Sequence, residues 1–208
     1  MVGSEILREI VVKISDDGKK ISGTGFFVSE TEIATCYHVL ADKKGQLSEC
    51  YFARNDGWKD WIRVVPINEK CSEPQDIAFL NCPIPISLSL NRIPFAPWNG
   101  KSKEFLSRGY DINNSAIEGA WTINEKDCEI VDYTYLGSEL RLQLKSIKKT
   151  LLPGRSGSPV WSVSQKAIVG MIDHQGGDEN AQTDRSMAIP IEKLGIDITY
   201  PSPKIGTI

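Results

Sequence analysis

The side chains most able to do chemistry lie in a glycine-rich stretch of the last third of the chain, Gly154–Pro159. Ser156 has a glycine close on either side, and such a tight backbone leaves a hydroxyl accessible while amide N–H groups converge around it. A serine hydroxyl is a poor nucleophile at neutral pH and needs a neighbouring base. The sequence contains two histidines, His38 and His174, so few residues can act as that base. The combination predicts nucleophilic catalysis by serine.

A third residue, Asp76, opens an apolar run and has the chemistry to orient an imidazole through its Nδ1–H. Asp76 follows His38 by 38 residues, and Ser156 follows Asp76 by 80. Taken singly, a glycine-flanked serine is usually a turn, a histidine usually a surface residue, and an acid before a strand usually a cap. The Gly-x-Ser-x-Gly elbow of α/β-hydrolases is excluded, because position 158 is serine and no long helix follows.

A period of two dominates the sequence and predicts short β-strands. Over Glu139–Lys145 the alternation is strict, so three leucines lie on one face of a half-buried strand and polar residues lie on the other. Short strands about every ten residues, separated by turn residues, predict an all-β barrel or sandwich. Pro190–Leu194 is predicted as a helical turn, with Gly195 after it. The other expected strands are Ile10–Ile14, Ile21–Val28, Glu32–Cys36, Ile62–Ile67, Ile77–Cys82, Trp121–Ile123, Glu129–Tyr135, Val160–Val163 and Ala167–Ile172.

The most irregular stretch is Cys82–Gly100, which carries four prolines. Prolines at this density break sheet pairing and favour an extended connection. The stretch predicts two β-rich domains, residues 1–90 and residues 91–208. The alternative is a long surface loop inside a single sandwich.

Charge and composition narrow the function classes. The chain has 24 Lys and Arg against 27 Asp and Glu, a net charge of −3, which is too mild to indicate a partner among nucleic acids or membranes. No apolar run approaches the ~20 residues that span a bilayer, and the first residues lack the apolar stretch of a signal peptide. We therefore expect a cytoplasmic protein. The five cysteines include no Cys-x-x-Cys pair, so we expect reduced thiols, no metal site and no cofactor.

Six segments, taken in chain order, resemble the trypsin-like serine peptidase family, and most of all its compact bacterial, HtrA-like branch. No single segment is specific, but the ordered set spans most of the chain. The segments are the glycine-rich strand Gly23–Val28, the histidine segment Ile33–Leu40, the acid segment Asp76–Leu80, the nucleophile loop Leu152–Val160, the following strand Ile168–Ile172, and the cleft strand Ser186–Pro190.

The resemblance implies two packed antiparallel six-stranded β-barrels with the active site at their interface. It also implies a serine endopeptidase that binds protein or peptide substrates in a cleft and hydrolyses their peptide bonds through an acyl-enzyme intermediate. His38, Asp76 and Ser156 are expected to be catalytic, and the oxyanion hole is expected from the backbone N–H groups of Gly154 and Ser156. The residues expected to bind substrate are Thr150, Asp173, His174, Gln175 and Ser186. A neutral Thr150 at the floor of the specificity pocket predicts an uncharged residue before the cut.

Two residues depart from the family pattern. Arg155 stands where members activated by cleavage have an aspartate, so activation by a freed N-terminus is not expected. Asp173 replaces a small residue beside the triad acid, and a second carboxylate there can raise the pKa of Asp76 or displace it. The alternative is therefore a protease-like domain that binds extended peptides without catalysis, and an esterase is a minor third reading. The chain is either a stand-alone peptidase for regulated cleavage or a domain that works with a regulatory partner or an additional domain.

Overall fold

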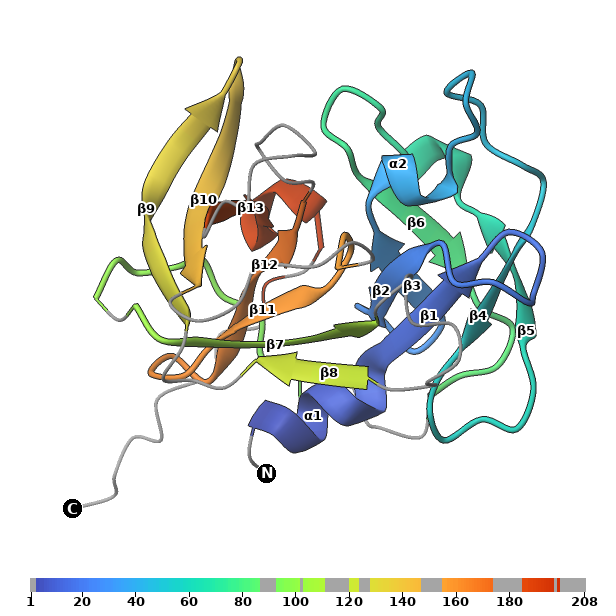
Figure 1. Ribbon diagram of the computed structural model, residues 1–208, viewed down its shortest axis with the longest axis horizontal. Coiled ribbons are helices and arrows are strands. Elements are labelled where there is room, and N and C mark those ends of the chain that lie inside the picture. Colours follow the sequence, from blue (N-terminus) through green and yellow to red (C-terminus); the bar gives the residue numbers. More distant parts are fainter. Residues whose placement is uncertain are drawn as a thin grey trace.

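The computed structural model describes residues 3–86, 93–101, 103–110, 120–123, 128–146, 155–173, 185–196 and 198. Its strands form two separate antiparallel sheets that lie side by side (Figure 1). The first sheet is a closed barrel in the order β1-β2-β3-β6-β5-β4, because β1 pairs with both β2 and β4. Its strands are β1 (Val11–Ser15), β2 (Gly23–Phe27), β3 (Glu32–Thr35), β4 (Tyr51–Arg54), β5 (Ile62–Pro66) and β6 (Ala78–Asn81).

The second sheet has seven strands in the order β8-β7-β11-β12-β13-β10-β9. A bridge between Glu104, just before β7, and Glu129 in β9 brings six of these strands round into a barrel, and β8 adds to it as an extra edge strand. The two-barrel fold that the resemblance implies is therefore confirmed. The strands are β7 (Phe105–Tyr110), β8 (Ala120–Ile123), β9 (Cys128–Leu136), β10 (Glu139–Ser146), β11 (Pro159–Ser162), β12 (Ala167–Ile172) and β13 (Arg185–Pro190).

The predicted strands of the sequence correspond to observed ones within a few residues, except at the start. There, α1 (Gly3–Ile10) is a helix, and β1 begins only at Val11. The strand predicted at Ile10–Ile14 is confirmed from Val11 onward, and only Ile10 belongs instead to α1, where Ile6, Leu7 and Ile10 lie on one buried face at helical spacing. Two short strands, β4 and β7, were not predicted at all.

The short helical elements lie in the segments that follow strands. α2 (Tyr37–Leu40) follows β3, and η1 (Asn68–Lys70) follows β5. The predicted helical turn near Pro190 is confirmed as η4 (Ile191–Leu194), which ends at Gly195 in the left-handed conformation with φ 64°. The predicted domain boundary between residues 90 and 91 lies outside the described residues.

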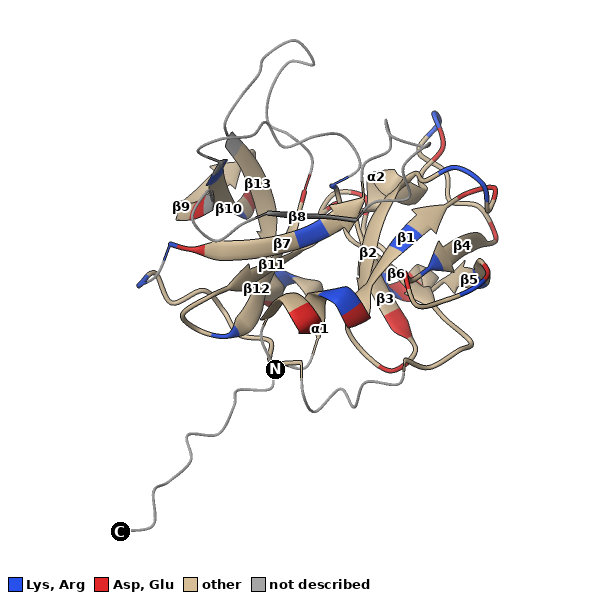
Figure 2. Cartoon of the chain, turned by 60° about the horizontal axis from the view of Figure 1, so that its bottom comes forward, with Lys and Arg blue, Asp and Glu red and all other residues tan. Residues whose placement is uncertain are grey.

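The buried side chains form two clusters. The larger one fills the first barrel and continues across the interface to Trp161, Ile168 and Met171 of the second. The smaller one, around Phe105 and Leu142, fills the second barrel. Because one apolar cluster contains residues of both barrels, its packing fixes the orientation of one barrel relative to the other. Residues of both charge signs are scattered along the described elements (Figure 2). None of the described helices is long and apolar enough to cross a membrane.

Candidate active site

His38 and Asp76 meet at the end of the first barrel, on α2 and just before β6. Asp76 Oδ2 lies 2.7 Å from His38 Nδ1, and Asp76 Oδ1 accepts the backbone N–H of His38 at 2.9 Å. Both oxygens of one carboxylate thus hold one histidine, which fixes the ring and assigns its proton to Nδ1. The His38 side chain is 40% exposed, so its second nitrogen can act as a base toward a bound group.

The backbone at Asp76 is strained. Its φ of 57° lies in the left-handed region that non-glycine residues seldom adopt. Hydrogen bonds hold it there, because Asp76 N–H donates to the carbonyl of Glu73 at 3.0 Å and the carbonyl of Asp76 accepts from Tyr37 N–H at 3.2 Å. Backbone strain held by its surroundings is typical of functional sites, and here it aims the carboxylate at His38.

Ser156 lies in a tight turn before β11. Ser158 N–H donates to the carbonyl of Arg155 at 2.9 Å, and Gly157 has φ 86°. A Cβ at Gly157 would overlap the carbonyl oxygen of Thr24, so this position requires glycine on two counts. Gly157 is therefore required where the serine loop of the second barrel packs closely against Thr24 of the first barrel.

The serine loop and the histidine segment converge on one carbonyl. The Ile172 oxygen accepts the N–H of Gly157 at 2.8 Å and the thiol of Cys36 at 3.3 Å. Gly157 follows the candidate nucleophile directly, and Cys36 precedes His38 by two residues. The end of β12 therefore brings together two of the three predicted catalytic segments.

Four of the predicted site residues, Thr150, Gly154, His174 and Gln175, lie outside the described residues. Ser186, in β13, is 2% exposed, and within the described part of the chain its Oγ has no hydrogen-bond partner. Arg155 is 5% exposed, so the residue before Ser156 points into the protein. The backbone N–H of Asp173 donates to the carbonyl of Met187 at 2.9 Å.

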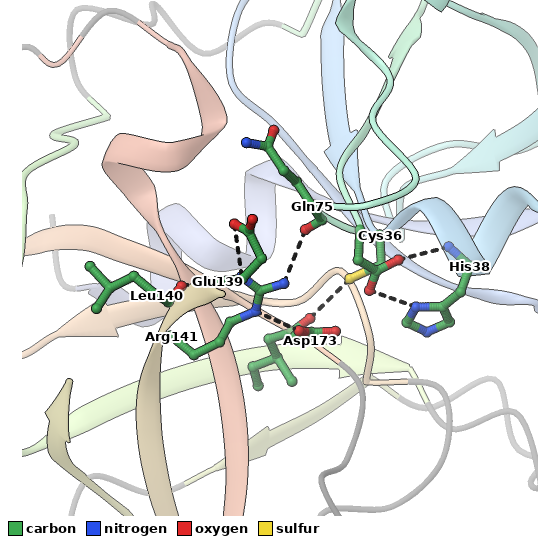
Figure 3. A network of polar contacts seen from close by, with 9 residues as sticks. Cys36, His38, Gln75, Glu139, Leu140, Arg141 and Asp173 are labelled. Atoms are coloured by element: carbon green, nitrogen blue, oxygen red, sulfur yellow. Dashed lines mark hydrogen bonds and ion pairs between the residues drawn. The ribbon is translucent and has the colours of Figure 1, made fainter. Parts of the chain in front are cut away.

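The Asp173 side chain contacts an arginine that sequence reasoning missed (Figure 3). Arg141 Nε donates to Asp173 Oδ2 at 2.8 Å, and both residues are almost fully buried. The alternation over Glu139–Lys145 placed Arg141 on an exposed polar face, yet it is 3% exposed. An arginine at the centre of a strand with leucines on the opposite face was the signal available, but nothing local distinguishes it from a surface arginine.

Burial and neighbouring charges shift the pKa values of His38, Asp76 and Cys36. Burial lowers the pKa of His38, but the hydrogen bond and charge of Asp76 and the charge of Asp173 outweigh it and raise the pKa above 6.5. Burial raises the pKa of Asp76, but the hydrogen bonds and the charge of His38 outweigh it and hold the pKa below 3.8. Burial and both carboxylates raise the pKa of Cys36 well above 9.0, so its thiol stays protonated.

Cys36, His38, Asp76 and Asp173 have donor atoms within 4.8 Å of one another. These atoms already engage partners within the protein, since the thiol donates to Ile172 and Nδ1 of His38 contacts Asp76. A cation placed among them would break the contact between His38 and Asp76. The donor atoms of this cluster are therefore engaged in hydrogen bonds and ion pairs within the described part of the chain.

Comparison with known proteins decides the family. The model of the trypsin-like peptidase domain matches residues 23–171, a range that holds the whole set of His38, Asp76 and Ser156. The chain belongs to the trypsin-like peptidase domain family. A peptidase domain acts on a protein or peptide, so that substrate class follows from the family.

The fold of this trypsin-like peptidase domain is also found among solved structures. It is similar to a crystal structure of Rv3671c from M. tuberculosis H37Rv, described as the inactive form of a serine-to-alanine mutant. The TM-score is 0.66 at 16% sequence identity, over 92% of this chain and 85% of that one. At this identity the similarity shows the fold alone. No curated protein matches the chain.

Proposed function

We propose that this peptidase domain is a serine endopeptidase in which His38, Asp76 and Ser156 form the catalytic triad. The observation that supports it is the double hold of Asp76 on His38, through Nδ1 at 2.7 Å and through the backbone N–H at 2.9 Å. A histidine held in this way keeps its proton on Nδ1 and offers Nε2 to a serine hydroxyl.

The reaction then proceeds in two displacements. Ser156 Oγ attacks the peptide carbonyl while its proton passes to His38 Nε2, and His38 returns the proton to the leaving amine. Water attacks the acyl-enzyme by the same route and releases the acid. The N–H groups of Ser156 and Gly154 are the proposed oxyanion donors, each contributing about 3–4 kcal/mol to transition-state stabilisation in comparable sites.

The proposed substrate is an extended segment of a protein that adds its backbone to the strand edge at residues 173–175. The proposed pocket has Thr150 at its floor and Ser186 in its wall, and neither carries a charge. A buried Lys or Arg without a partner there would cost several kcal/mol, so we propose cleavage after uncharged residues. Regulated cleavage and a place in the bacterial cytoplasm stay predictions.

A peptide-binding domain without catalysis is the second candidate, because Asp173 stands close to Asp76. An uncompensated carboxylate at this position would raise the pKa of Asp76 or displace its side chain from His38. The ion pair of Asp173 with Arg141 at 2.8 Å compensates that charge, and this favours the enzyme.

A fluorophosphonate probe, which labels activated serines covalently, tests the proposal. We expect the wild type to label, and Ser156→Ala and His38→Ala to abolish labelling. Ser164→Ala, an exposed serine in the turn after β11, is the matched control and should label as the wild type does. His174→Ala should change peptide preference more than labelling. A wild type that does not label under varied conditions would favour the binding domain.

A further inference from the structure

Arg141 and Asp173 form a buried ion pair beside the candidate triad. Their side chains are 4% and 5% exposed, and Nε of Arg141 lies 2.8 Å from Oδ2 of Asp173. Taking two charges out of water is expensive, and a buried pair is retained at no cost only when its hydrogen bonds are good. Apolar side chains would fill this space with a smaller desolvation penalty. Stability alone therefore does not account for the pair, and its position beside the site indicates a role there.

The guanidinium of Arg141 reaches across to the first barrel. Its Nη2 donates to the backbone carbonyl of Gln75 at 3.2 Å, while Nη1 donates to the carbonyl of Leu140 at 3.1 Å. The Gln75 carbonyl belongs to the peptide unit that leads into Asp76, the residue with the strained φ. One side chain of β10 therefore holds the peptide unit that aims the triad acid.

Asp173 lies between Arg141 and His38 (Figure 3), close to the carboxylate of Asp76. Two neighbouring carboxylates disfavour each other's ionisation and raise the pKa of one of them unless a cation compensates their charge. Arg141 is the cation in contact with Asp173. Among the described residues, the other titratable groups near this pair are His38, the neutral thiol of Cys36, and Glu139, whose Oε2 lies 3.9 Å from Nη1 of Arg141.

We propose that Arg141 and Asp173 are positioning residues, in which Arg141 keeps Asp173 ionised beside the triad and fastens the peptide unit before Asp76 to the second barrel. The inference rests on the proposed serine endopeptidase. It goes further because it assigns a role to a buried arginine and makes the second carboxylate part of the mechanism. Asp173 adds negative charge near His38 and so favours the imidazolium that forms during the reaction.

The test is a cycle of Arg141→Met, Asp173→Asn and the double variant, with exposed Arg63→Met as matched control. In Arg141→Met the two carboxylates lack their cation, so we expect kcat/KM at neutral pH to fall about tenfold or more, and its acid limb to move to higher pH. The double variant removes the extra carboxylate as well, so it should be more active than Arg141→Met. Arg141→Lys keeps the cation, and its acid limb should stay near that of the wild type.

A second readout does not depend on cleavage. In a His174→Gln background His38 is the only histidine, so NMR titration of its ring reports one pKa. We expect Asp173→Asn and the double variant to lower the pKa of His38, because a negative charge beside the imidazole is lost. The double variant carries no unpaired buried charge, so it gives an answer even if a single variant does not fold.

A double variant less active than Arg141→Met, or a His38 titration unchanged by loss of Asp173, would overturn the proposal. An unchanged titration would mean that Asp173 is already neutral in the working enzyme. If the wild type failed to react with fluorophosphonate while the titration moved as expected, the endopeptidase proposal would fail and the charge linkage would stand.

Discussion

The backbone N–H of Thr24, in β2, donates a hydrogen bond to the carbonyl oxygen of Ser156 at 3.1 Å. The carbonyl of Thr24 accepts the hydroxyl of Thr35 at 2.7 Å, and its own hydroxyl oxygen accepts the N–H of Tyr110 at 3.1 Å. Thr24 is fully buried, and its polar groups all have partners. The position of the candidate nucleophile is thus set by a strand of the opposite barrel.

Gly157→Ala should disrupt this junction. The new Cβ would overlap the carbonyl of Thr24 and would sit on a residue with φ 86°. We expect a loss of at least about 2 kcal/mol in the free energy of unfolding, together with loss of fluorophosphonate labelling. Thermal unfolding and labelling rates measure the two effects.

Gly137→Ala is the matched control for that substitution. Gly137 also has positive φ, 61°, but no atom lies within 4 Å of an added Cβ. It should lose only about 1 kcal/mol and keep its labelling. Equal losses in the two variants would mean that the contact with Thr24 does not matter.

Asp76→Asn should impair catalysis without unfolding the protein. An asparagine can donate to Nδ1 and so select the wrong tautomer of His38, and we expect kcat/KM to fall by about 10⁴. The pKa of His38 should also fall, because Asp76 raises it by hydrogen bond and charge. Steady-state kinetics and ring NMR measure these effects, and an unchanged kcat/KM would refute the role of Asp76.

Stability should depend on pH through His38. Its pKa in the folded protein is raised above 6.5, so its ionised form stabilises the fold fully below 6.5, and this contribution is lost as the pH rises through the folded value. We expect the difference in unfolding free energy between the wild type and His38→Gln to shrink from about pH 5 to about pH 9. A difference that grows with pH would contradict the direction of the shift.

Cys36 should resist alkylation in the folded protein. It is fully buried, donates to the Ile172 carbonyl at 3.3 Å, and has a raised pKa that disfavours the reactive thiolate. Cys50, which is partly exposed, should react with iodoacetamide first. Mass spectrometry of peptides from native and unfolded protein measures the order. Early modification of Cys36 would mean that the junction opens readily.

A second set of charges at the barrel interface should matter for stability alone. Lys13 is 4% exposed and lies 3.7 Å from Asp56, which also pairs with Arg108 of β7 at 2.7 Å. Asp56→Asn leaves both cations without this partner, so we expect a loss of about 2 kcal/mol in the free energy of unfolding. Denaturant titration measures it, and Lys13→Met in the same background should recover part of the loss. Recovery of nothing would assign the effect to Arg108.

Local patterns in the sequence determined much of the fold and the identity of the candidate residues. Alternation predicted most strands. The glycines beside Ser156 predicted a tight turn with an accessible hydroxyl, and Asp76 before the β6 run was the predicted partner of His38. These signals are short-range, because a strand face, a positive φ or a turn depends on a few neighbouring residues. The order of His38, Asp76 and Ser156 along the chain, together with the segments around them, indicated the resemblance to the peptidase family.

Tertiary structure alone decided the environment of that set. The alternation that buried Leu142 and Leu144 gave no reason to bury Arg141, whose partners Asp173 and Gln75 lie 32 and 66 residues away in the chain. Alternation reports only that one face of a strand is apolar. Whether the polar face is covered as well depends on which distant segments pack against it, here Asp173 after β12 of the same barrel and Gln75 of the first barrel.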